Sequence, residues 1–360
     1  EMMNRIGVAE AYRMAQSYRA IAGDAWTLPS FFKVQADASR NWDFSYVDLF
    51  VEDGIATITI NRPEAMNALN EVVVAQLTEA VQAANADSKV STVVLDGAGK
   101  AFVAGADVKF FVDKIRSDDI PDIETFTANG HALLAAIEDS PKTTIALTTG
   151  LALGGGLELA LACDYRIGTQ RTQFRFPETS IGIYPALGGT QRPARIAGRE
   201  LGRWAVLAGN FMNAETATDL GLVTHLVDIN DVPNCINDIH ASGKPGNKYP
   251  GRPMNENSPV VKFAKKFFSD GNMAALLAGG CPEGFDAEDK TVARQLKSLK
   301  FTAPIGLAMA SERIDATASM SLDEGLQLEL QGLDRIFSTE DALEGLSALI
   351  EGRRATYKNA

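Results

Sequence analysis

The chain has 360 residues and a formal net charge of −12. This acidic balance argues against binding to nucleic acid or to anionic membranes, because both are themselves negatively charged. Three cysteines without a C-x-x-C spacing and three scattered histidines offer neither a disulfide framework nor a zinc motif. No signal peptide and no run of about 20 apolar residues is present. We therefore expect a cytoplasmic globular protein with free thiols and no metal.

Residues 1–43 predict an N-terminal helical extension. Ala11, Met14, Ala15 and Tyr18 share one face at helical spacing, and a break follows at residues 27–30, Thr-Leu-Pro-Ser. Because the chain begins with Glu and not with Met, we also expect it to be part of a longer protein.

Residues 44–228 alternate between strands and helices. Two strand patterns, 46–51 and 55–60, flank an Asp-Gly pair, which is a strong hairpin signal. The later pattern predicts helices over 71–86, 121–138 and 155–161, and strands over 91–95, 143–147 and 164–168. This rhythm indicates an α/β fold with largely parallel strands.

The remaining chain divides into two parts. Residues 229–300 include a turn-rich, polar stretch, so we interpret them as an insertion on the surface. Residues 301–360 form a C-terminal helical region, with helices predicted over 304–318 and 322–337 and a third starting near residue 338.

A first glycine-containing segment, residues 97–107, follows a predicted strand. It lacks the spacing of a P-loop, because Val94 and Ala101 occupy two of the required positions, and Phe102 stands where a dinucleotide loop has its third glycine. We expect a strand-to-helix loop in which Asp107 caps the following helix.

A second segment, Gly154-Gly155-Gly156, opens a helix that contains Glu158. Glycines let the backbone approach a ligand, and a helix N-terminus directs free N–H groups at it, which suits an oxyanion hole. Tight helix packing explains the glycines equally well. Glu158 favours function, because a carboxylate in an apolar helix is costly to bury unless it is used or paired.

A third segment places Glu178 after Pro177. A glutamate in this position often only starts a helix. Together with Glu158, however, it could hold a water molecule, one carboxylate taking a proton and the other supplying one. The separation in sequence does not establish that the two are close in space.

Together these segments resemble the crotonase (enoyl-CoA hydratase/isomerase) superfamily from about residue 44 to the C-terminus, interrupted by 229–300. The resemblance is carried by five groups of residues: Ile60-Asn61-Arg62-Pro63 with Asn67-Ala68-Leu69; Ala101-Phe102 with Ala104-Gly105-Ala106-Asp107; Ala152-Leu153-Gly154-Gly155-Gly156 with Glu158-Leu159-Ala160; Pro177-Glu178; and Gly182, Pro185 and Gly188-Gly189-Thr190-Gln191-Arg192.

The resemblance implies a crotonase-like ββα spiral with a C-terminal helical oligomerisation region and assembly into a homotrimer or hexamer. It implies that the amides of Ala106 and Gly155 form the oxyanion hole, that Glu158 activates water and that Glu178 exchanges the α-proton. Coenzyme A is then part of the substrate and no separate cofactor is needed. Residues expected to contact the acyl-CoA are Arg62, Ala65, Asn67, Ala68, Ala104, Asp107, Val108, Lys109, Gly154, Pro185 and Gly188.

Three positions depart from the family pattern. Arg175 and Ala186 stand where hydratases commonly have glycine, and Arg175 could narrow the pocket, lower the pKa of Glu178 or bind a polar acyl tail. Gly352 replaces a lysine that reaches CoA phosphates; Arg353 or Arg354 either takes this role or is a solvated surface charge.

These features predict an enoyl-CoA hydratase, a lyase that reversibly converts trans-2-enoyl-CoA to 3-hydroxyacyl-CoA in fatty-acid or short-chain acyl-CoA metabolism. Alternatives are an acyl-CoA isomerase or thioester hydrolase on the same scaffold, or a non-catalytic CoA- or RNA-binding module. Residues 1–8 with Tyr12 and Tyr18 resemble the second helical domain of 3-hydroxyacyl-CoA dehydrogenases. This resemblance implies a fusion to an upstream NAD-dependent dehydrogenase, without an NAD site in this chain, and the alternative is an ordinary N-terminal helical extension.

Overall fold

The computed structural model describes residues 3, 6–23, 27–39, 42, 44–246 and 253–360. The chain divides into two compact units, Glu1–Ser45 and Tyr46–Ala360. The division falls at 45/46, close to the boundary at 43/44 expected from the sequence.

The first unit contains two helices, α2 (Val8–Ala22) and α3 (Ser30–Asp37). Pro29 is the N-cap of α3, so the predicted break at residues 27–30 ends where the second helix starts. A small core forms from Val8, Ala11, Phe32 and Ala36. The predicted apolar face of the first helix is only partly used, because Met14 and Tyr18 are each 58% exposed.

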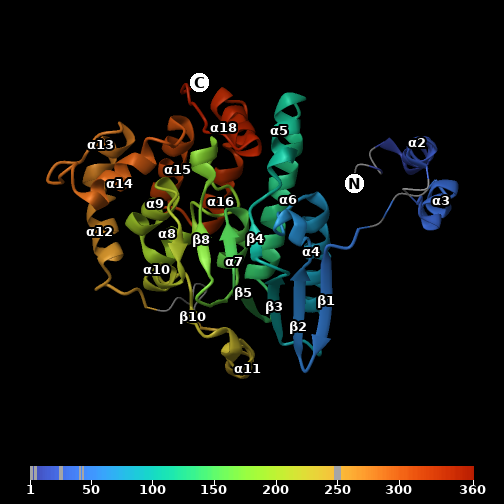
Figure 1. The fold of residues 1–360 in the computed structure, drawn as a ribbon. Helices are drawn as coiled ribbons and strands as arrows, with labels where there is room; N and C mark the ends of the chain where they lie inside the picture. Colours follow the sequence, from blue (N-terminus) through green and yellow to red (C-terminus); the bar gives the residue numbers. More distant parts are fainter. Residues whose placement is uncertain (1–2, 4–5, 24–26, 40–41, 43, 247–252) are drawn as a thin grey trace. The chain divides into compact units, whose positions relative to one another are not determined.

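The second unit is built on two sheets, drawn in Figure 1. The first sheet has the strand order β1 (Val47–Glu52), β2 (Ile55–Ile60), β3 (Thr92–Gly97), β5 (Thr143–Thr148), β7 (Tyr165–Gly168) and β10 (His225–Leu226). The second has the order β4 (Ala101–Ala104), β6 (Leu151–Leu153), β8 (Gln173–Arg175) and β9 (Met212–Asn213).

Successive strand pairs wind the chain into a spiral. In β3–β4, β5–β6 and β7–β8, the first strand joins the first sheet and the second joins the second sheet. Neighbouring turns are parallel in both sheets, with Val94 beside Ile145 in one and Ala104 beside Leu153 in the other. Only the ends differ, since β1–β2 is the predicted antiparallel hairpin and β8–β9 is also antiparallel. The predicted ββα spiral is confirmed.

Helices complete each turn of the spiral. The helix predicted over 71–86 is α4, and Asn70 caps it by accepting a hydrogen bond from the backbone N–H of Val73. The helices of this part are α4 (Glu71–Ala86), α5 (Val108–Arg116), α6 (Ile120–Glu138), α7 (Gly155–Ala162), α8 (Arg192–Ala197), α9 (Arg199–Leu207) and α10 (Ala214–Asp219), with short 3-10 turns η2 (Pro63–Ala65) and η3 (Glu178–Ile181).

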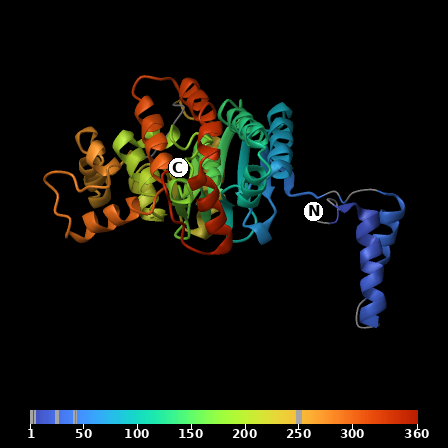
Figure 2. The same ribbon diagram turned by 90° about the horizontal axis from the view of Figure 1, so that it is seen from above.

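The interval 229–300 is mostly helical, which corrects the interpretation as a surface excursion. Phe267 and Phe268 have no exposed surface and belong to the main hydrophobic core. The turn-forming residues near 241–259 concealed the amphipathic helices on either side. The elements are η4 (Ile229–Asp231), α11 (Val232–Ser242), α12 (Pro259–Phe267), η5 (Asp270–Asn272), α13 (Met273–Leu277) and α14 (Lys290–Leu299). In Figures 1 and 2, α12–α14 lie at the end of the second unit opposite the β1–β2 hairpin.

The C-terminal helices pack back onto the spiral. They are α15 (Pro304–Ala316), α16 (Leu322–Leu330), α17 (Leu333–Phe337) and α18 (Glu340–Glu351). The helix predicted over 322–337 is divided at Gly332, where a Cβ would approach the Tyr184 hydroxyl to 2.7 Å. α16 contacts α6, and α18 contacts α5 and η3. No helix within the described ranges is long and apolar enough to cross a bilayer.

Candidate active site

Glu158 lies one turn into α7, a helix whose residues are all buried, and it is itself 2% exposed. Its Oε1 accepts hydrogen bonds from the backbone N–H groups of Leu187 and Gly189, each at 2.7 Å. Two amides from a distant loop therefore hold one oxygen of this carboxyl. The apolar helix thus contains a carboxyl that is paired, as the cost of its burial requires.

Glu178 begins η3, directly after Pro177, and is 7% exposed. Among the described residues, none forms a hydrogen bond with its buried Oε2. The carboxyl passes so close to Gly154 that a Cβ on this glycine would collide with Oε1. A Cβ on Gly155 would stand 3.9 Å from Oε2 of Glu158. The two carboxyls thus meet beside adjacent glycines, the proximity that the sequence left open.

Burial raises the pKa of both carboxyls, to different extents. Burial raises the pKa of Glu158 to about 7, although the two loop amides and Arg192 act in the opposite direction. The pKa of Glu178 is raised well above its usual value by burial and then by the neighbouring Glu158. Near neutral pH, Glu158 is therefore the carboxyl that ionises, and Glu178 keeps its proton.

The two amides expected in the oxyanion hole lie on neighbouring turns of the spiral. Ala104 on β4 pairs with Leu153 on β6, which places Ala106 and Gly155 two residues beyond paired positions. The Gly155 N–H is the first of α7 and has no acceptor within that helix. Leu69 bonds to Gly105 and Asp107 on either side of Ala106, so the Ala106 N–H faces away from Leu69.

Asn67 corrects one expected ligand contact, because it has no exposed surface. Its Nδ2 donates to the carbonyl oxygens of Ala98, Ala101 and Phe102 at 2.8–3.1 Å. Its Oδ1 accepts from the N–H of Arg62 at 2.9 Å. The side chain therefore ties the loop between β2 and α4 to the chain between β3 and β4.

Replacing Asn67 by Ala is expected to lower the free energy of unfolding by about 3 kcal/mol, because buried carbonyls and an amide lose their partner. Urea denaturation followed by circular dichroism measures this change. Met66→Ala is the matched control, since Met66 also has positive φ, 52° against 60° for Asn67, and is 40% exposed. Equal midpoints for the two variants would contradict the assignment.

The other expected acyl-CoA contacts differ in accessibility. Arg62 is 8% exposed and bonds to the Ala68 carbonyl and to Asp107, both at 3.2 Å. Asp107 occupies the N-cap of α5 but pairs with Arg62 and makes no side-chain capping bond, which corrects its predicted role. Lys109 is exposed; Ala65, Ala68, Ala104 and Val108 are partly exposed; Gly154, Pro185 and Gly188 are buried.

Arg175 is held by its own neighbours. Its Nε donates to the Gly209 carbonyl at 2.7 Å, and its guanidinium lies over the Phe211 ring, 4.9 Å from the centroid. It lowers the pKa of Glu178, as expected, but burial dominates and the net shift is upward. Arg175 also lines a cavity of about 740 Å³ with Lys300, Arg354 and other residues.

The C-terminal arginines are engaged within the chain. Arg353 forms a two-pronged hydrogen bond with Glu344 at 2.6 and 2.7 Å, and the Arg354 guanidinium lies 3.4 Å from the centroid of the Phe301 ring. Arg353 is therefore paired with Glu344 within the chain.

The sequence interpretation missed another buried carboxyl close to Glu158, that of Glu329 on α16, which has no exposed surface. It accepts hydrogen bonds from the N–H groups of Gly188, at 2.6 Å, and Thr190, at 3.1 Å. Burial and Glu158 raise its pKa to about 8. The sequence contains a signal for this residue, because Leu328-Glu329-Leu330 has the same pattern, a carboxylate between two leucines, that drew attention to Glu158.

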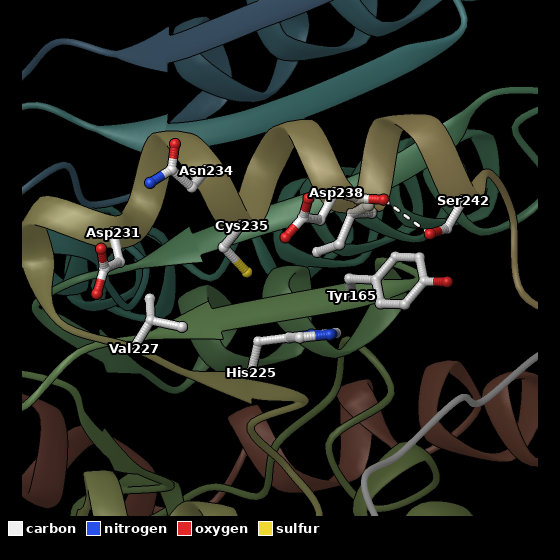
Figure 3. A pocket seen from close by; sticks show the side chains of 9 residues that line it. Tyr165, His225, Val227, Asp231, Asn234, Cys235, Asp238 and Ser242 are labelled. Atoms are coloured by element: carbon white, nitrogen blue, oxygen red, sulfur yellow. Dashed lines mark hydrogen bonds between the residues drawn. The ribbon is translucent and has the colours of Figure 1, made fainter.

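A separate cavity of about 450 Å³ lies between α11 and strands β7 and β10 (Figure 3). Tyr165, His225 and Cys235 are among the residues that line it, whereas neither active-site glutamate does.

No group of three or more His, Cys, Asp or Glu in the described part of the chain could hold a metal ion. All three cysteines are free.

Comparison with known proteins agrees with this geometry. Residues 55–358 match the enoyl-CoA hydratase/isomerase family, so the chain belongs to that family, and the match includes 229–300. It is 30% identical to a crotonyl-CoA hydratase of Syntrophomonas wolfei over 307 residues, 85% of this chain and 95% of the relative. It is 28% identical to a short-chain-enoyl-CoA hydratase of Clostridium acetobutylicum over 88% of this chain and 99% of the relative.

Among solved structures, an enoyl-CoA hydratase from Rhodobacter sphaeroides superposes with a TM-score of 0.73 at 27% identity, covering 86% of this chain and 90% of that one. The predicted superfamily and fold are thereby confirmed.

Proposed function

We propose that this chain is an enoyl-CoA hydratase that reversibly adds water to trans-2-enoyl-CoA thioesters and forms 3-hydroxyacyl-CoA. One observation carries the proposal: two buried carboxyls meet beside Gly154-Gly155, and the pKa of Glu178 is raised further than that of Glu158, so the two differ in protonation over the pH range between the two pKa values. Such a pair supplies a base and an acid at the same pH. The relatives named as hydratases support the same reaction.

Glu158 acts as the base. Its Oε1 is fixed by the amides of Leu187 and Gly189, which stabilise the ionised form and leave the other oxygen to face a water molecule. As the water oxygen bonds to the β-carbon of the substrate, its proton passes to Glu158. The electron pair of the carbon–carbon double bond moves toward the thioester carbonyl and generates an enolate.

Glu178 acts as the acid, and the glycine-lined turn stabilises the charge. The N–H groups of Ala106 and Gly155 donate to the enolate oxygen, where negative charge develops. The protonated carboxyl of Glu178 then delivers its proton to the α-carbon. Water has been added across the double bond, one carboxyl has gained a proton and the other has lost one, so a proton exchange through solvent restores the enzyme.

The CoA moiety is proposed to lie along the loop that contains Ala65 and Ala68 and toward exposed Lys109. Lys109 is the cation of the expected contact set with an accessible side chain, since Arg62 is buried against Asp107. Ala104, Val108, Gly154, Pro185 and Gly188 line the path toward the carboxyls in this proposal. The acyl chain length is left open.

Hydration of crotonyl-CoA tests the proposed reaction directly. The purified chain is expected to abolish the enone absorbance and to release 3-hydroxybutyryl-CoA, identified by chromatography. A stable absorbance, combined with CoA binding measured by calorimetry, would instead indicate a binding module.

The pH profile of kcat/KM is expected to be bell-shaped, because the reaction needs ionised Glu158 and protonated Glu178. Activity rises as pH increases through about 7, where Glu158 ionises. It falls at higher pH, where Glu178 loses its proton, since the pKa of this carboxyl is raised well above its usual value. A profile that stays flat from about pH 5 to about pH 8 would contradict this division of roles.

Assembly into a homotrimer or hexamer is proposed through the C-terminal helices. Leu349 and Ile350 are adjacent apolar residues on α18 that are 51% and 43% exposed, and a neighbouring subunit would cover them. Light scattering coupled to size-exclusion chromatography would report three or six times the chain mass, and a monomer would contradict the proposal. A cytoplasmic location is proposed because all three cysteines are free.

A fusion to an upstream dehydrogenase is likewise proposed. Residues 1–45 form their own unit, and the family match starts only at residue 55. The hydratase relatives are matched over 95% and 99% of their length by 85% and 88% of this chain, so part of this chain lies outside both matches. Immunodetection of the native protein with an antibody against the second unit would measure the full length.

A further inference from the structure

The loop over residues 187–190 divides its backbone N–H groups between two buried carboxyls. The N–H groups of Leu187 and Gly189 point to Glu158, both at 2.7 Å. Those of Gly188 and Thr190 point to Glu329, at 2.6 and 3.1 Å. The segment is a turn with Gly188 at φ +93°, and its successive amides alternate between the two carboxyls, so each carboxyl binds two of the four N–H groups.

The Glu329 side of this loop is fixed by several further contacts. The Thr190 hydroxyl is in hydrogen-bond contact with Oε1 of Glu329. The Gln191 side chain donates to the Thr190 hydroxyl at 3.0 Å and to the Arg313 carbonyl on α15 at 2.9 Å. The Tyr184 hydroxyl, on the chain that enters the loop, donates to the Glu329 carbonyl at 2.5 Å. The loop is thereby held against α15 and α16.

On the side that faces Glu158, the loop is packed too tightly to accommodate a side chain at Gly189. A Cβ at Gly189 would come within 2.7 Å of Oε1 of Glu158 and 2.5 Å of Pro185. Gly188 has φ +93°, a conformation that side chains rarely adopt. A small rotation of the loop would therefore move the Leu187 and Gly189 amides off Glu158.

We propose that Glu329 is a positioning residue for the hydration reaction: by binding the Gly188 and Thr190 amides, it orients the Leu187 and Gly189 amides that hold Glu158 ready to accept a proton. This inference rests on the proposed function. Glu329 touches the loop and not the reacting atoms, so it acts only through Glu158.

The charged and titratable groups around Glu329 come from every neighbouring element. They are Glu158 on α7, Arg192 on α8, His131 on α6 at 3.9 Å, and Tyr184 with Arg313 lying over its ring. Nε2 of His131 donates to the Ala186 carbonyl at 2.6 Å, and burial lowers the pKa of His131 to about 4, so the ring is neutral near pH 7. The pKa of Glu329 is about 8, so near pH 7 it influences Glu158 mainly through the loop and little through charge.

Glu329→Gln separates this role from simple support of the fold. A carboxamide can accept from one amide but directs its NH₂ group at the other, so the loop must turn. We expect kcat for crotonyl-CoA to fall at least ~10-fold while KM stays within about threefold, the pattern of a lost transition-state interaction. We also expect the acidic limb of the kcat/KM profile to move to higher pH, since Glu158 loses amide stabilisation of its ionised form.

Glu324→Gln on the same helix is the matched control. Glu324 is exposed and forms the capping box of α16 with Ser321, so its loss weakens the helix without touching the loop. Its kcat and acidic limb are expected to match the parent. If Glu329→Gln fails to fold, Thr190→Val removes one contact to Glu329 and is expected to change kcat and the limb in the same directions.

Amide hydrogen exchange of residues 186–192, measured without substrate, keeps this test independent of the proposed function. Faster exchange of this segment in Glu329→Gln, but not in Glu324→Gln, supports the positioning role even if the parent hydrates no enoyl-CoA. Unchanged exchange would overturn it. If the parent is active, an unchanged kcat or an unchanged acidic limb of the pH profile in Glu329→Gln would also overturn the proposal. An acidic limb moved to lower pH would overturn it as well, because this shift would indicate that Glu329 acts through its charge.

Discussion

Glu158→Gln and Glu178→Gln are each expected to reduce kcat for hydration of crotonyl-CoA at least ~100-fold, the loss typical of removing a general base or acid. The carboxamide nearly preserves the size of the side chain, so the loss reports proton transfer. Glu158→Gln can still accept the Leu187 and Gly189 hydrogen bonds through its oxygen but cannot take a proton from water. Glu178→Gln has no proton to deliver to the α-carbon.

Deuterium exchange separates the two roles. In deuterated water of alkaline pD, where the raised pKa of Glu178 is exceeded and its carboxyl is ionised, Glu178 is expected to exchange the α-protons of butyryl-CoA, a saturated substrate to which no water adds. Glu158→Gln should retain this exchange, whereas Glu178→Gln should lose it. Glu215→Gln, an exposed residue on α10, is the control for the substitution itself. Full hydratase turnover in both active-site variants would refute the assignment.

Stability measurements show whether these variants are folded, and their sign follows from the raised pKa. A carboxyl whose pKa rises on folding stabilises the folded state while it is protonated. This contribution is fully present below the pKa in the unfolded chain, near 4.5, and is lost as pH increases through the pKa in the folded protein, about 7 for Glu158. Glu178 follows the same sign over a window that extends higher. Glu178→Gln is therefore expected to unfold at higher urea concentration than the parent at about pH 8, with the difference shrinking toward about pH 4, near the pKa of a carboxyl in the unfolded chain.

Gly154→Ala is the second substitution with a large expected effect, a decrease in kcat of at least ~100-fold, as for loss of the acid itself. Gly154 has φ +48°, and an added Cβ would collide with Oε1 of Glu178. Because Glu178 is enclosed, its carboxyl must move away from the position beside Glu158. The variant should show the same loss of α-proton exchange as Glu178→Gln.

Gly279→Ala separates this collision from backbone strain. Gly279 has φ +75°, also a conformation unfavourable for alanine, but nothing lies within 4 Å of the added Cβ. Both variants should lose about 1 kcal/mol of stability from the backbone, and only Gly154→Ala should lose activity. Equal activities would show that Glu178 tolerates displacement and that its position is not decisive.

The sequence predicted the features that depend on local patterns. The structure contains the predicted strand Ile55–Ile60, the Asp-Gly turn and the helix over 71–86. Each could be predicted because an element buried on one face has apolar residues at regular spacing in the sequence. Glu158 was also recognisable, since a carboxylate among leucines and alanines demands a partner. What no local pattern contains is the partner itself, the amides of Leu187 and Gly189.

Long-range contacts explain the remaining differences. Asn67 resembles any polar loop residue in the sequence, and only the fold shows that three carbonyls from residues 98–102 surround its amide. In 229–300, the glycines and prolines near the turn led to the prediction of a surface loop. The helical spacing of Val261, Ala264 and Phe267, which are completely buried in the core, indicated a helix instead. Glu329 lay more than 130 positions from the loop that it holds, as its bond to Thr190 spans 139.

The spiral has a consequence for how this site can change during evolution. Ala106 follows β4, Gly155 follows β6 and Glu178 follows β8, and these strands are neighbours in one sheet. Each turn therefore adds a functional group where its strand ends, and the turn after β6 adds both Gly155 and Glu158. Exchange of one of these residues can alter the acid, the base or the anion binder alone, while the hydrogen-bonded registers of the strands keep the other groups in place.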